Sequence, residues 1–437
     1  MGKKLQKVSV FWFRRDLRLT DNTGLHFALK ENPNVLPIFI FDTDILNKLD
    51  DKQDARVTFI YNGLSALRDE LKESGSSLLV RYGNPLDVFR DLLHSYTIIA
   101  VYCNHDYEPY AISRDNEIAN YLKQRQISFK SFKDQVVFEK DEVVKEDKTP
   151  YTVFTPYMRK WKALCKPEHL KALDTRPFLK HFLKTKQFTF PELKELGFKK
   201  STVHFPAATI NIKTIQRYDV TRDIPSITGT SRLSVHLRFG TVSIRQLASK
   251  AMQYNEKWLN ELIWREFFMM ILWHFPQVVK KSFKPRYDNI EWRNDEKDFN
   301  AWCEGKTGYP FVDAGMRELN ATGYMHNRLR MVTAGFLTKH LLIDWRWGEA
   351  YFAKKLLDYE LASNNGNWQW AAGCGCDAAP YFRVFNPGIQ QKKFDPDYKY
   401  VRKWIPGFKE NNYLPPLVEH PKARTRAIAT YKKALKS

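Results

Sequence analysis

A short stretch rich in hydroxyl groups is the first place in the sequence where chemistry could be expected. Residues 218–234 read YDVTRDIPSITGTSRLS, and Thr230, Ser231 and Ser234 stand at the start of a predicted helix. Free backbone N–H groups and hydroxyls at a helix start bind phosphate well, and Arg232 adds a cation. Taken alone, however, a plain capped helix start is the simpler interpretation.

Tryptophan is concentrated in the second half of the chain. Ten of the twelve tryptophans lie beyond residue 250. Core packing accounts for any single one of them, but large apolar cores are usually built from Leu, Ile and Val. So many tryptophans, with Tyr and Arg among them, indicate a flat aromatic ligand, stacked bases or electron hopping.

The net charge of the chain favours a polyanionic partner. Seventy Lys and Arg against 49 Asp and Glu leave a formal charge of +21, spread along the chain without one long tail. Lys and Arg gain affinity for phosphates by releasing counterions, so nucleic acid is a natural partner. A generally basic proteome or an adaptation for solubility is the alternative.

The cysteines and the apolar segments indicate a cytoplasmic protein. The five cysteines are scattered and odd in number, which suits free thiols in a reducing compartment. Cys374 and Cys376 lack further ligands at metal-binding spacing, so no metal site is expected. There is neither a signal-peptide pattern nor an apolar run of about 20 residues, the length that spans a membrane.

The N-terminal part of the sequence alternates apolar runs with amphipathic segments. Strands are predicted at 8–13, 35–42, 77–83 and 97–104, and helices at 55–74, 85–94 and 111–125. This alternation predicts an α/β domain with a parallel, Rossmann-like sheet wrapped by helices. Ligands bind such sheets beyond the carboxyl ends of the strands, where Asp42, Asn104 and Glu108 stand.

The strand pattern stops in the second half of the chain. Residues 136–205 are rich in Lys, interrupted by Pro and without a clear period. Helices are then predicted at 231–252, 255–273, 309–321, 325–341 and 347–357. We therefore expect an α/β domain over 1–135, a connector over 136–205 and a mostly α-helical domain over 206–437.

Several long motifs carry a resemblance to a known family. They are FWFRRDLRLTDN (11–22), WLNELIWRE (258–266), EGKTGYPFVDAGMRELNATGYMHNRLRM (304–331), LLIDWRWGEAYF (341–352) and DYELASNNGNWQWAAGCGCDAAPYFRVFNP (358–387). Together they resemble the photolyase/cryptochrome family almost from end to end. Within that family the chain looks like a class I photolyase, which acts on cyclobutane pyrimidine dimers (CPDs).

The resemblance implies a U-shaped FAD in the helical domain. The positions that match the flavin site are Tyr218, Thr230, Ser231, Arg232, Leu233, Ser234, Trp258, Arg330, Asp358, Glu360 and Asn364. Arg330 and Asp358 would pair beside the isoalloxazine and tolerate an anionic reduced flavin, and Asn364 would face flavin N5. Glu360 stands where the family more often shows Asp, and Asn367 where Gly is usual.

The resemblance also implies a DNA-binding face for UV-damaged DNA. The matching positions are Arg222, Glu261, Trp264, Arg265, Asn327, Arg328, Met331, Gln369 and Trp370. Trp264 and Trp370 would pack on the pyrimidines of a flipped-out dimer, and Glu261 and Asn327 would hydrogen-bond their edges. Arg328, like Arg222, would bind backbone phosphate.

The expected reaction is that of a light-driven carbon–carbon lyase. Excited, reduced anionic FAD would pass one electron to the dimer, the cyclobutane ring would open, and the electron would return. Glu261 and Asn364 are the expected catalytic side chains. Trp368, Trp345 and Trp292 match the family's chain of tryptophans that photoreduces oxidised flavin, and core packing is the alternative role for them.

A second chromophore and three rival functions stay open at this point. Asn104, Tyr107 and Glu108 fit the family's antenna site, which would hold a folate, a deazaflavin or nothing. The rivals are a cryptochrome-type blue-light receptor, a (6-4) photoproduct photolyase and a light-independent flavoprotein that binds nucleic acid. The basic charge and the set of dimer-binding residues favour repair, and Met331 stands where (6-4) enzymes use a His. A monomer without protein partners is expected.

Overall fold

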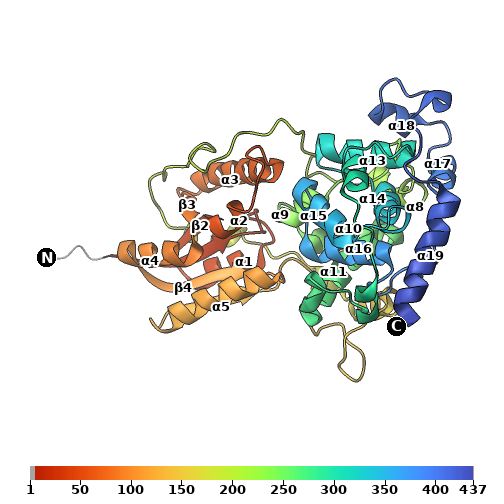
Figure 1. The fold of residues 1–437 in the computed structure, drawn as a ribbon. Coiled ribbons are helices and arrows are strands. Elements are labelled where there is room, and N and C mark those ends of the chain that lie inside the picture. The colour runs from red at the N-terminus through yellow and green to blue at the C-terminus, as the bar shows by residue number, and fades with distance from the viewer. Residues whose placement is uncertain (1–4, 437) are drawn as a thin grey trace. The chain divides into compact units, whose positions relative to one another are not determined.

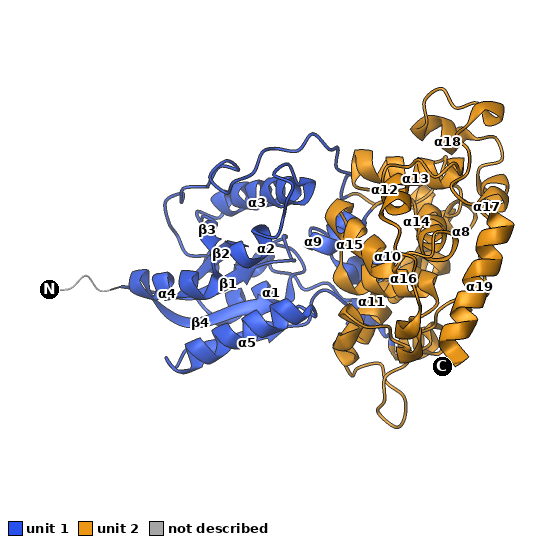
Figure 2. Ribbon diagram, in the orientation of Figure 1, with its two compact units in different colours: residues 1–139, 165–208, 233–250 blue, residues 140–164, 209–232, 251–437 orange. Residues whose placement is uncertain are grey.

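A computed structural model of the chain describes residues 5–436. The chain forms two compact units that are interleaved in sequence (Figure 2). Unit 1 holds the chain up to residue 139 together with 165–208 and 233–250, and unit 2 holds 140–164, 209–232 and the chain from 251 onward. The three consecutive segments expected from the sequence contain no such interleaving.

Unit 1 is built on a five-stranded, all-parallel sheet with the strand order β3-β2-β1-β4-β5 (Figure 1). The strands are β1 Gln6–Phe13, β2 Val35–Asp42, β3 Leu79–Gly83, β4 Tyr96–Asn104 and β5 Ser128–Phe132. Most of β1 and all of β2 are buried, and strands covered on both faces read as continuous apolar runs. The predicted parallel α/β fold is confirmed.

The sequence pattern does not predict the fifth strand. β5 lies at the sheet edge, pairs with β4, and reads SFKSF with no fully buried residue. An edge strand that faces solvent carries a weaker apolar signal than a central one. The α-helices along the sheet are α1 Thr23–Glu31, α2 Thr43–Leu46, α3 Ala55–Glu73, α4 Pro85–Ser95 and α5 Pro109–Lys123.

The prediction of one helix over 231–252 is wrong. The structure has two helices there, α9 Ser234–Phe239 and α10 Ile244–Tyr254. They are separated at Gly240, which ends α9 in the left-handed conformation with φ 65°. A Cβ at this position would lie 2.1 Å from the backbone oxygen of Arg15, so only glycine permits this close approach.

Buried ion pairs tie α10 to the rest of unit 1. Arg245 donates hydrogen bonds of 2.9 Å to both Asp21 and Asp134, and Arg18 donates one of 2.6 Å to Asp134. Buried charges of this kind are tolerated only when they are fully paired. The pairing accounts for the membership of 233–250 in unit 1.

Unit 2 is helical. Its α-helices are α6 Phe154–Leu164, α7 Ile212–Gln216, α8 Tyr218–Thr221, α11 Glu256–His274, α12 Glu296–Cys303, α13 Pro310–Thr322, α14 Asn327–Gly335, α15 Trp345–Lys355, α16 Leu361–Ala372, α17 Pro387–Phe394, α18 Lys399–Trp404 and α19 His420–Lys436. Short 3-10 turns are η1 Pro167–Leu170 and η2 Arg176–His181 in unit 1, and η3 Pro276–Val279, η4 Pro285–Asn289 and η6 Glu410–Asn412 in unit 2; η5 Phe336–His340 is a π-helical turn.

The core of unit 2 is aromatic as well as aliphatic. Trp302, Trp345, Phe352 and Trp368 are buried in one cluster with residues of α13 and α14. The expected mostly helical second domain is therefore confirmed. Within residues 5–436, no helix combines the length and the apolar character needed to cross a membrane.

Candidate functional site

The stretch 230–234 does not begin a helix where the sequence predicts one. Thr230 to Leu233 are irregular, and α9 starts only at Ser234. Arg232 has a left-handed backbone with φ 52°, which interrupts any helix at this point. Thr230, Ser231 and Arg232 belong to unit 2, whereas Leu233 and Ser234 belong to unit 1.

Tyr324 gathers three of the polar residues expected around FAD. The guanidinium carbon of Arg232 lies 4.7 Å from the centre of its ring, and that of Arg330 lies 5.8 Å away. The hydroxyl of Thr230 lies 3.4 Å from the Tyr324 hydroxyl. Cations over a tyrosine ring are attracted by its π-face. Two positive charges are thus held on one ring.

Arg330 and Asp358 form the pair that the resemblance implies. Nη2 of Arg330 donates to both carboxylate oxygens of Asp358, at 2.8 and 3.1 Å, and its Nε donates to the backbone oxygen of Met325 at 2.8 Å. Burial alone would lower the pKa of Arg330, but the Asp358 carboxylate more than offsets it, so the pKa is raised. The cation is therefore permanent and fixed in orientation.

Asn364 is oriented by the partly buried carboxyl group of Glu349. Its Nδ2 donates to Oε1 of Glu349 at 2.8 Å and to the Glu349 backbone oxygen at 3.1 Å. Burial raises the pKa of Glu349, and the hydrogen bond from Asn364 opposes part of that rise. The Oδ1 of Asn364 accepts no hydrogen bond from residues 5–436, so it can accept one from a bound group.

Three further expected flavin residues, Tyr218, Trp258 and Glu360, are buried in unit 2. Tyr218 and Trp258 are 9% and 2% exposed. Glu360 is also buried, and its carboxylate lies 3.4 Å from the guanidinium of Arg265 and accepts from the Ser363 hydroxyl at 2.9 Å. The structure thus joins Arg265, expected at the DNA, to Glu360, expected at the flavin.

Most of the expected DNA-binding residues form one connected group. Glu261 is paired with Arg222, and burial raises the pKa of Glu261 against the opposing effect of that arginine. Arg328 donates to Asp223 at 2.7 Å, and one of its nitrogens lies 3.9 Å from the sulfur of Met331. The group therefore runs from α11 through the two residues that follow α8 to α14.

The residues on α14 share a face as their spacing predicts. The amide nitrogen of Asn327 lies 4.0 Å from the sulfur of Met331, one helical turn later. The guanidinium of Arg328 also lies 4.2 Å from the ring centre of Phe394. Trp370, on α16, is partly buried.

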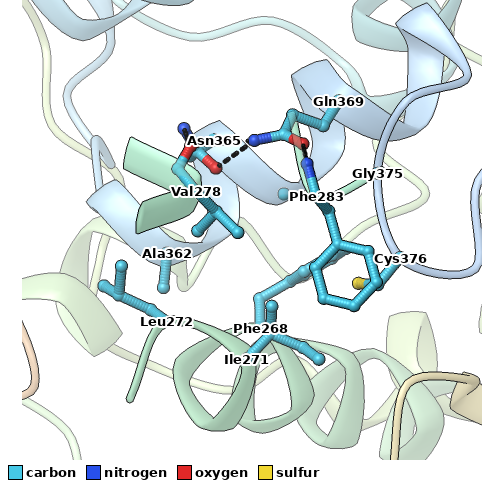
Figure 3. Close-up of a pocket in the computed structure, with 11 residues that line it drawn as sticks. Phe268, Ile271, Leu272, Val278, Phe283, Ala362, Asn365, Gln369, Gly375 and Cys376 are labelled. Carbon is cyan, nitrogen blue, oxygen red and sulfur yellow. Dashed lines mark hydrogen bonds between the residues drawn. The ribbon is translucent and has the colours of Figure 1, made fainter. Parts of the chain in front are cut away.

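Gln369 is placed differently from the other expected dimer contacts. It is 2% exposed, and its Nε2 donates to the backbone oxygen of Val278 at 2.8 Å. Its Oε1 accepts from the backbone N–H of Phe283 at 2.8 Å, and Asn365 contacts it from the preceding turn (Figure 3). Its amide braces the 278–283 segment beside a small pocket, so the structure does not present it with Glu261 and Asn327.

The three expected electron-carrying tryptophans lie in or beside the core of unit 2. Trp345 and Trp368 are 1% and 2% exposed, and Trp292 packs against the core from its edge. A Cβ on Gly348, one turn after Trp345, would lie 2.1 Å from the ring of Trp368. The ring centre of Trp292 lies 5.9 Å from that of Tyr431 on α19. The electron route itself stays a prediction.

Asn104 is a buried residue whose side chain hydrogen-bonds within unit 1. It is 3% exposed, and its Nδ2 donates to Asp16 at 2.5 Å and to Asn22 at 2.8 Å. Its Oδ1 accepts from the backbone N–H of Gly24 at 2.8 Å. Its amide is therefore committed to the fold at the end of β4, and a contact with an antenna chromophore would compete with these bonds.

Glu108 is likewise engaged within unit 1. Its carboxylate accepts from Arg15 at 3.0 Å and from Arg238 at 2.9 Å, and the hydroxyl of Tyr107 donates to Glu139 at 2.7 Å. The antenna role of these residues stays a prediction.

Three residues near the expected flavin and DNA groups were not found from the sequence. Tyr324 lies inside the quoted 304–331 motif, so its position could have drawn attention. Glu349 likewise lies inside the quoted 341–352 motif. Phe154 lies outside the quoted motifs and carries no comparable signal, because it matters only through a contact with a residue distant in sequence. Phe154 stacks on Trp264, with ring centres 3.7 Å apart and ring planes 7° apart.

Comparison with known proteins places the chain in a family. The family model described as DNA photolyase matches residues 9–177, and the one described as the FAD binding domain of DNA photolyase matches residues 258–412. A deoxyribodipyrimidine photo-lyase of Halobacterium salinarum is 35% identical over an alignment 480 residues long. The alignment covers 98% of this chain and 99% of that protein.

Solved structures give the same result. A class III photolyase from Agrobacterium tumefaciens superposes with a TM-score of 0.87 and 31% identity, covering 100% of this chain and 99% of the other. A photolyase from Sulfolobus tokodaii with two FAD molecules superposes with a TM-score of 0.82 and 34% identity, covering 98% and 100%. The chain therefore belongs to the DNA photolyase family and contains that family's FAD-binding domain.

Proposed function

We propose that this protein repairs UV-damaged DNA in the light by splitting cyclobutane pyrimidine dimers with bound FAD. The observation that carries the proposal is a continuous group of contacts in unit 2. Glu261 pairs with Arg222, and that guanidinium also lies 5.5 Å from the ring centre of Tyr218. Next to Arg222 in sequence, Asp223 pairs with Arg328. The expected DNA residues are thus contiguous with an expected flavin residue.

The residues of unit 2 fit FAD. Arg232 offers a fixed cation beside Thr230 for the pyrophosphate, and Arg330 offers a second cation for a reduced, anionic isoalloxazine. Asn364 has an amide oxygen that accepts nothing from the described residues. When bound, reduced FAD supplies the light-excited electron that opens the cyclobutane ring and takes it back afterward, so the reaction has no net redox change.

Protein side chains would hold the lesion by stacking, hydrogen bonding and a phosphate contact. Trp264 and Trp370 are both partly buried, as expected for rings that stack on an extruded dimer. Glu261, whose pKa is raised by burial, and Asn327 would hydrogen-bond the base edges. Arg328 would exchange Asp223 for a backbone phosphate.

The remaining assignments extend the same proposal. We assign DNA and flavin binding to the helical domain over 206–437 and an antenna role to the domain over 1–135. The antenna would be a folate, a deazaflavin or, as in the Sulfolobus tokodaii structure, a second flavin. The five free cysteines suit a protein that acts as a monomer in the reducing cytoplasm.

The experiment that tests the proposal is a repair assay with and without blue light. Purified protein with reduced FAD should remove dimers from DNA under illumination and leave them intact in the dark. Flavin photochemistry without any repair would favour a blue-light receptor. Repair of (6-4) photoproducts in place of CPDs would move the protein to the other repair class.

A further inference from the structure

One face of the Trp264 ring is covered by a residue from a distant part of the chain. Phe154 lies parallel to it, with ring centres 3.7 Å apart and an interplanar angle of 7°. Phe154 is 7% exposed and is the first residue of α6. An indole ring has two faces, so at most one face of Trp264 is left for another flat ring.

Phe154 is held in place because α6 is fastened to α11. The buried residues of α6 are Phe154, Tyr157 and Trp161, which share one helix face. The indole N–H of Trp161 donates to the buried carboxylate of Glu266 at 2.5 Å. The ring centre of Tyr157 lies 5.2 Å from that of Phe267. These contacts prevent α6 from sliding along α11.

A second anchor joins Phe154 to the loop that follows α16. The backbone N–H of Phe154 donates to Oδ2 of Asp377 at 3.1 Å. A carboxylate at the first turn of a helix is also favoured by the helix dipole. Asp377 lies seven residues after Trp370, so the residue that covers Trp264 is tied to the segment leading away from the other proposed base-stacking tryptophan.

We propose that Phe154 is a positioning residue for damage recognition, which holds the Trp264 ring so that the face opposite Phe154 meets a pyrimidine of the extruded dimer. The inference rests on the proposed function, because it assumes that Trp264 contacts the lesion. A ring that is fixed before binding loses less conformational freedom on binding than a mobile one. The loss of Phe154 should therefore weaken binding of damaged DNA alone.

The test compares binding of CPD-containing and undamaged oligonucleotides by Phe154→Leu and the unaltered protein. Loss of an aromatic stacking partner should weaken damaged-DNA binding about 2- to 10-fold. Binding of undamaged DNA and the FAD content should not change. Phe154→Tyr keeps the ring and should restore damaged-DNA binding. Phe311→Leu is the matched control, because Phe311 is also buried but contacts Tyr400 on α18.

A double-mutant cycle separates positioning from a general structural role. In a Trp264→Leu background, Phe154→Leu should cause no further loss of damaged-DNA binding, because the ring that it positions is gone. The inference would be overturned if Phe154→Leu reduced the affinity for damaged DNA equally with and without Trp264. It would also be overturned if Phe154→Leu weakened the binding of damaged and undamaged DNA equally. If Phe154→Leu loses its flavin, Phe154→Met is measured instead, because it keeps the volume without the ring.

The proposed function fails in a different way. If the unaltered protein shows no preference for CPD-containing DNA, the function itself is overturned, and the role of Phe154 falls with it. If the unaltered protein and Trp264→Leu differ as expected but Phe154→Leu matches the unaltered protein, only the role of Phe154 is overturned.

Discussion

Asn364 donates both to the side-chain Oε1 of Glu349, at 2.8 Å, and to the backbone oxygen of that residue, at 3.1 Å. The two bonds fix the amide plane of Asn364 on α16 against α15. Its Oδ1 accepts no hydrogen bond from residues 5–436 and is left to accept one from a bound group. Glu349 is thus a partly buried carboxyl group that acts through another residue.

We expect Glu349→Gln to remove a pH dependence of stability. Burial raises the pKa of Glu349 above the ordinary value of 4.5, so the protein prefers this group neutral. The free energy of unfolding should fall as the pH rises from about 4.5 through the raised pKa, because the unfolded chain ionises first. Gln is neutral and can still accept from Asn364, so the variant should lack this fall and keep its FAD.

Urea unfolding at several pH values measures this effect. The control is Glu304→Gln, an exposed glutamate beside Lys306. If Glu349→Gln and the unaltered protein had unfolding free energies with the same dependence on pH, Glu349 would not be the group that titrates.

We expect Trp345→Phe to block photoreduction of oxidised FAD but to spare repair by chemically reduced protein. Phenylalanine is much harder to oxidise than tryptophan, whereas electron transfer to the dimer does not pass through this position. The indole N–H of Trp345 has no partner among residues 5–436, so the change breaks no hydrogen bond.

Flavin absorbance under blue light measures photoreduction, and repair is measured separately after chemical reduction. Trp404→Phe is the matched control, because its indole N–H also lacks a partner within the described chain. Loss of both activities in Trp345→Phe would show that the residue is mainly structural.

Arg328→Ala should weaken the binding of damaged and undamaged DNA equally. It should also make the affinity depend less steeply on salt concentration. A phosphate contact carries electrostatic energy without base identity, and its loss reduces the salt slope by roughly one unit. In the structure the guanidinium of Arg328 is paired with Asp223. Asp223→Asn should therefore have the opposite effect and strengthen the binding of DNA. Titrations at several salt concentrations check both variants.

Trp264→Ala should show the reverse pattern. On the DNA, its ring would contact only an extruded lesion, so the loss of affinity should fall on damaged DNA, by about 1–3 kcal/mol if the contact behaves like other base-stacking contacts. The salt slope should stay as it is. If Trp264→Ala and Arg328→Ala weakened the binding of damaged and undamaged DNA in the same way, the assignment of Trp264 to the lesion and of Arg328 to a phosphate would be wrong.

Gly348→Ala should destabilise the protein although alanine is the better helix former. The added Cβ would lie 2.1 Å from the ring of Trp368 and 2.6 Å from Leu337. Overpacking of a core typically costs about 1–3 kcal/mol, which exceeds the gain of about 1 kcal/mol in helix propensity. Gly335→Ala is the control, since the nearest atom to its Cβ is 3.9 Å away. A Gly348→Ala variant as stable as Gly335→Ala would contradict this.

Central elements of the fold could be predicted from the sequence because their patterns are local. β1 and β2 are buried along most or all of their length and read as apolar runs. β5 could not be found this way, because it lies at the sheet edge, has no fully buried residue and combines two phenylalanines with Ser and Lys. The end of α9 at Gly240 could not be predicted either, because it depends on the close approach of the backbone oxygen of Arg15, 225 residues earlier.

The candidate site divides in the same way. Arg330 and Asp358 were expected as a pair, and the structure pairs them. Gln369 and Asn104 were expected to meet ligands, but their amides are buried and bonded to the protein. A motif gives the type of a residue but not the direction of its side chain, which depends on packing between distant segments.

The most direct test of the central claim is a count of CPDs in a defined oligonucleotide after incubation with the FAD-loaded, chemically reduced protein. Matched samples are kept under blue light and in darkness, and a sample without protein is illuminated as the control. We predict that the dimers disappear only in the illuminated sample with protein and that the original pyrimidines are restored. Equal dimer counts in light and darkness, with FAD bound and reduced, would contradict light-driven repair by this protein.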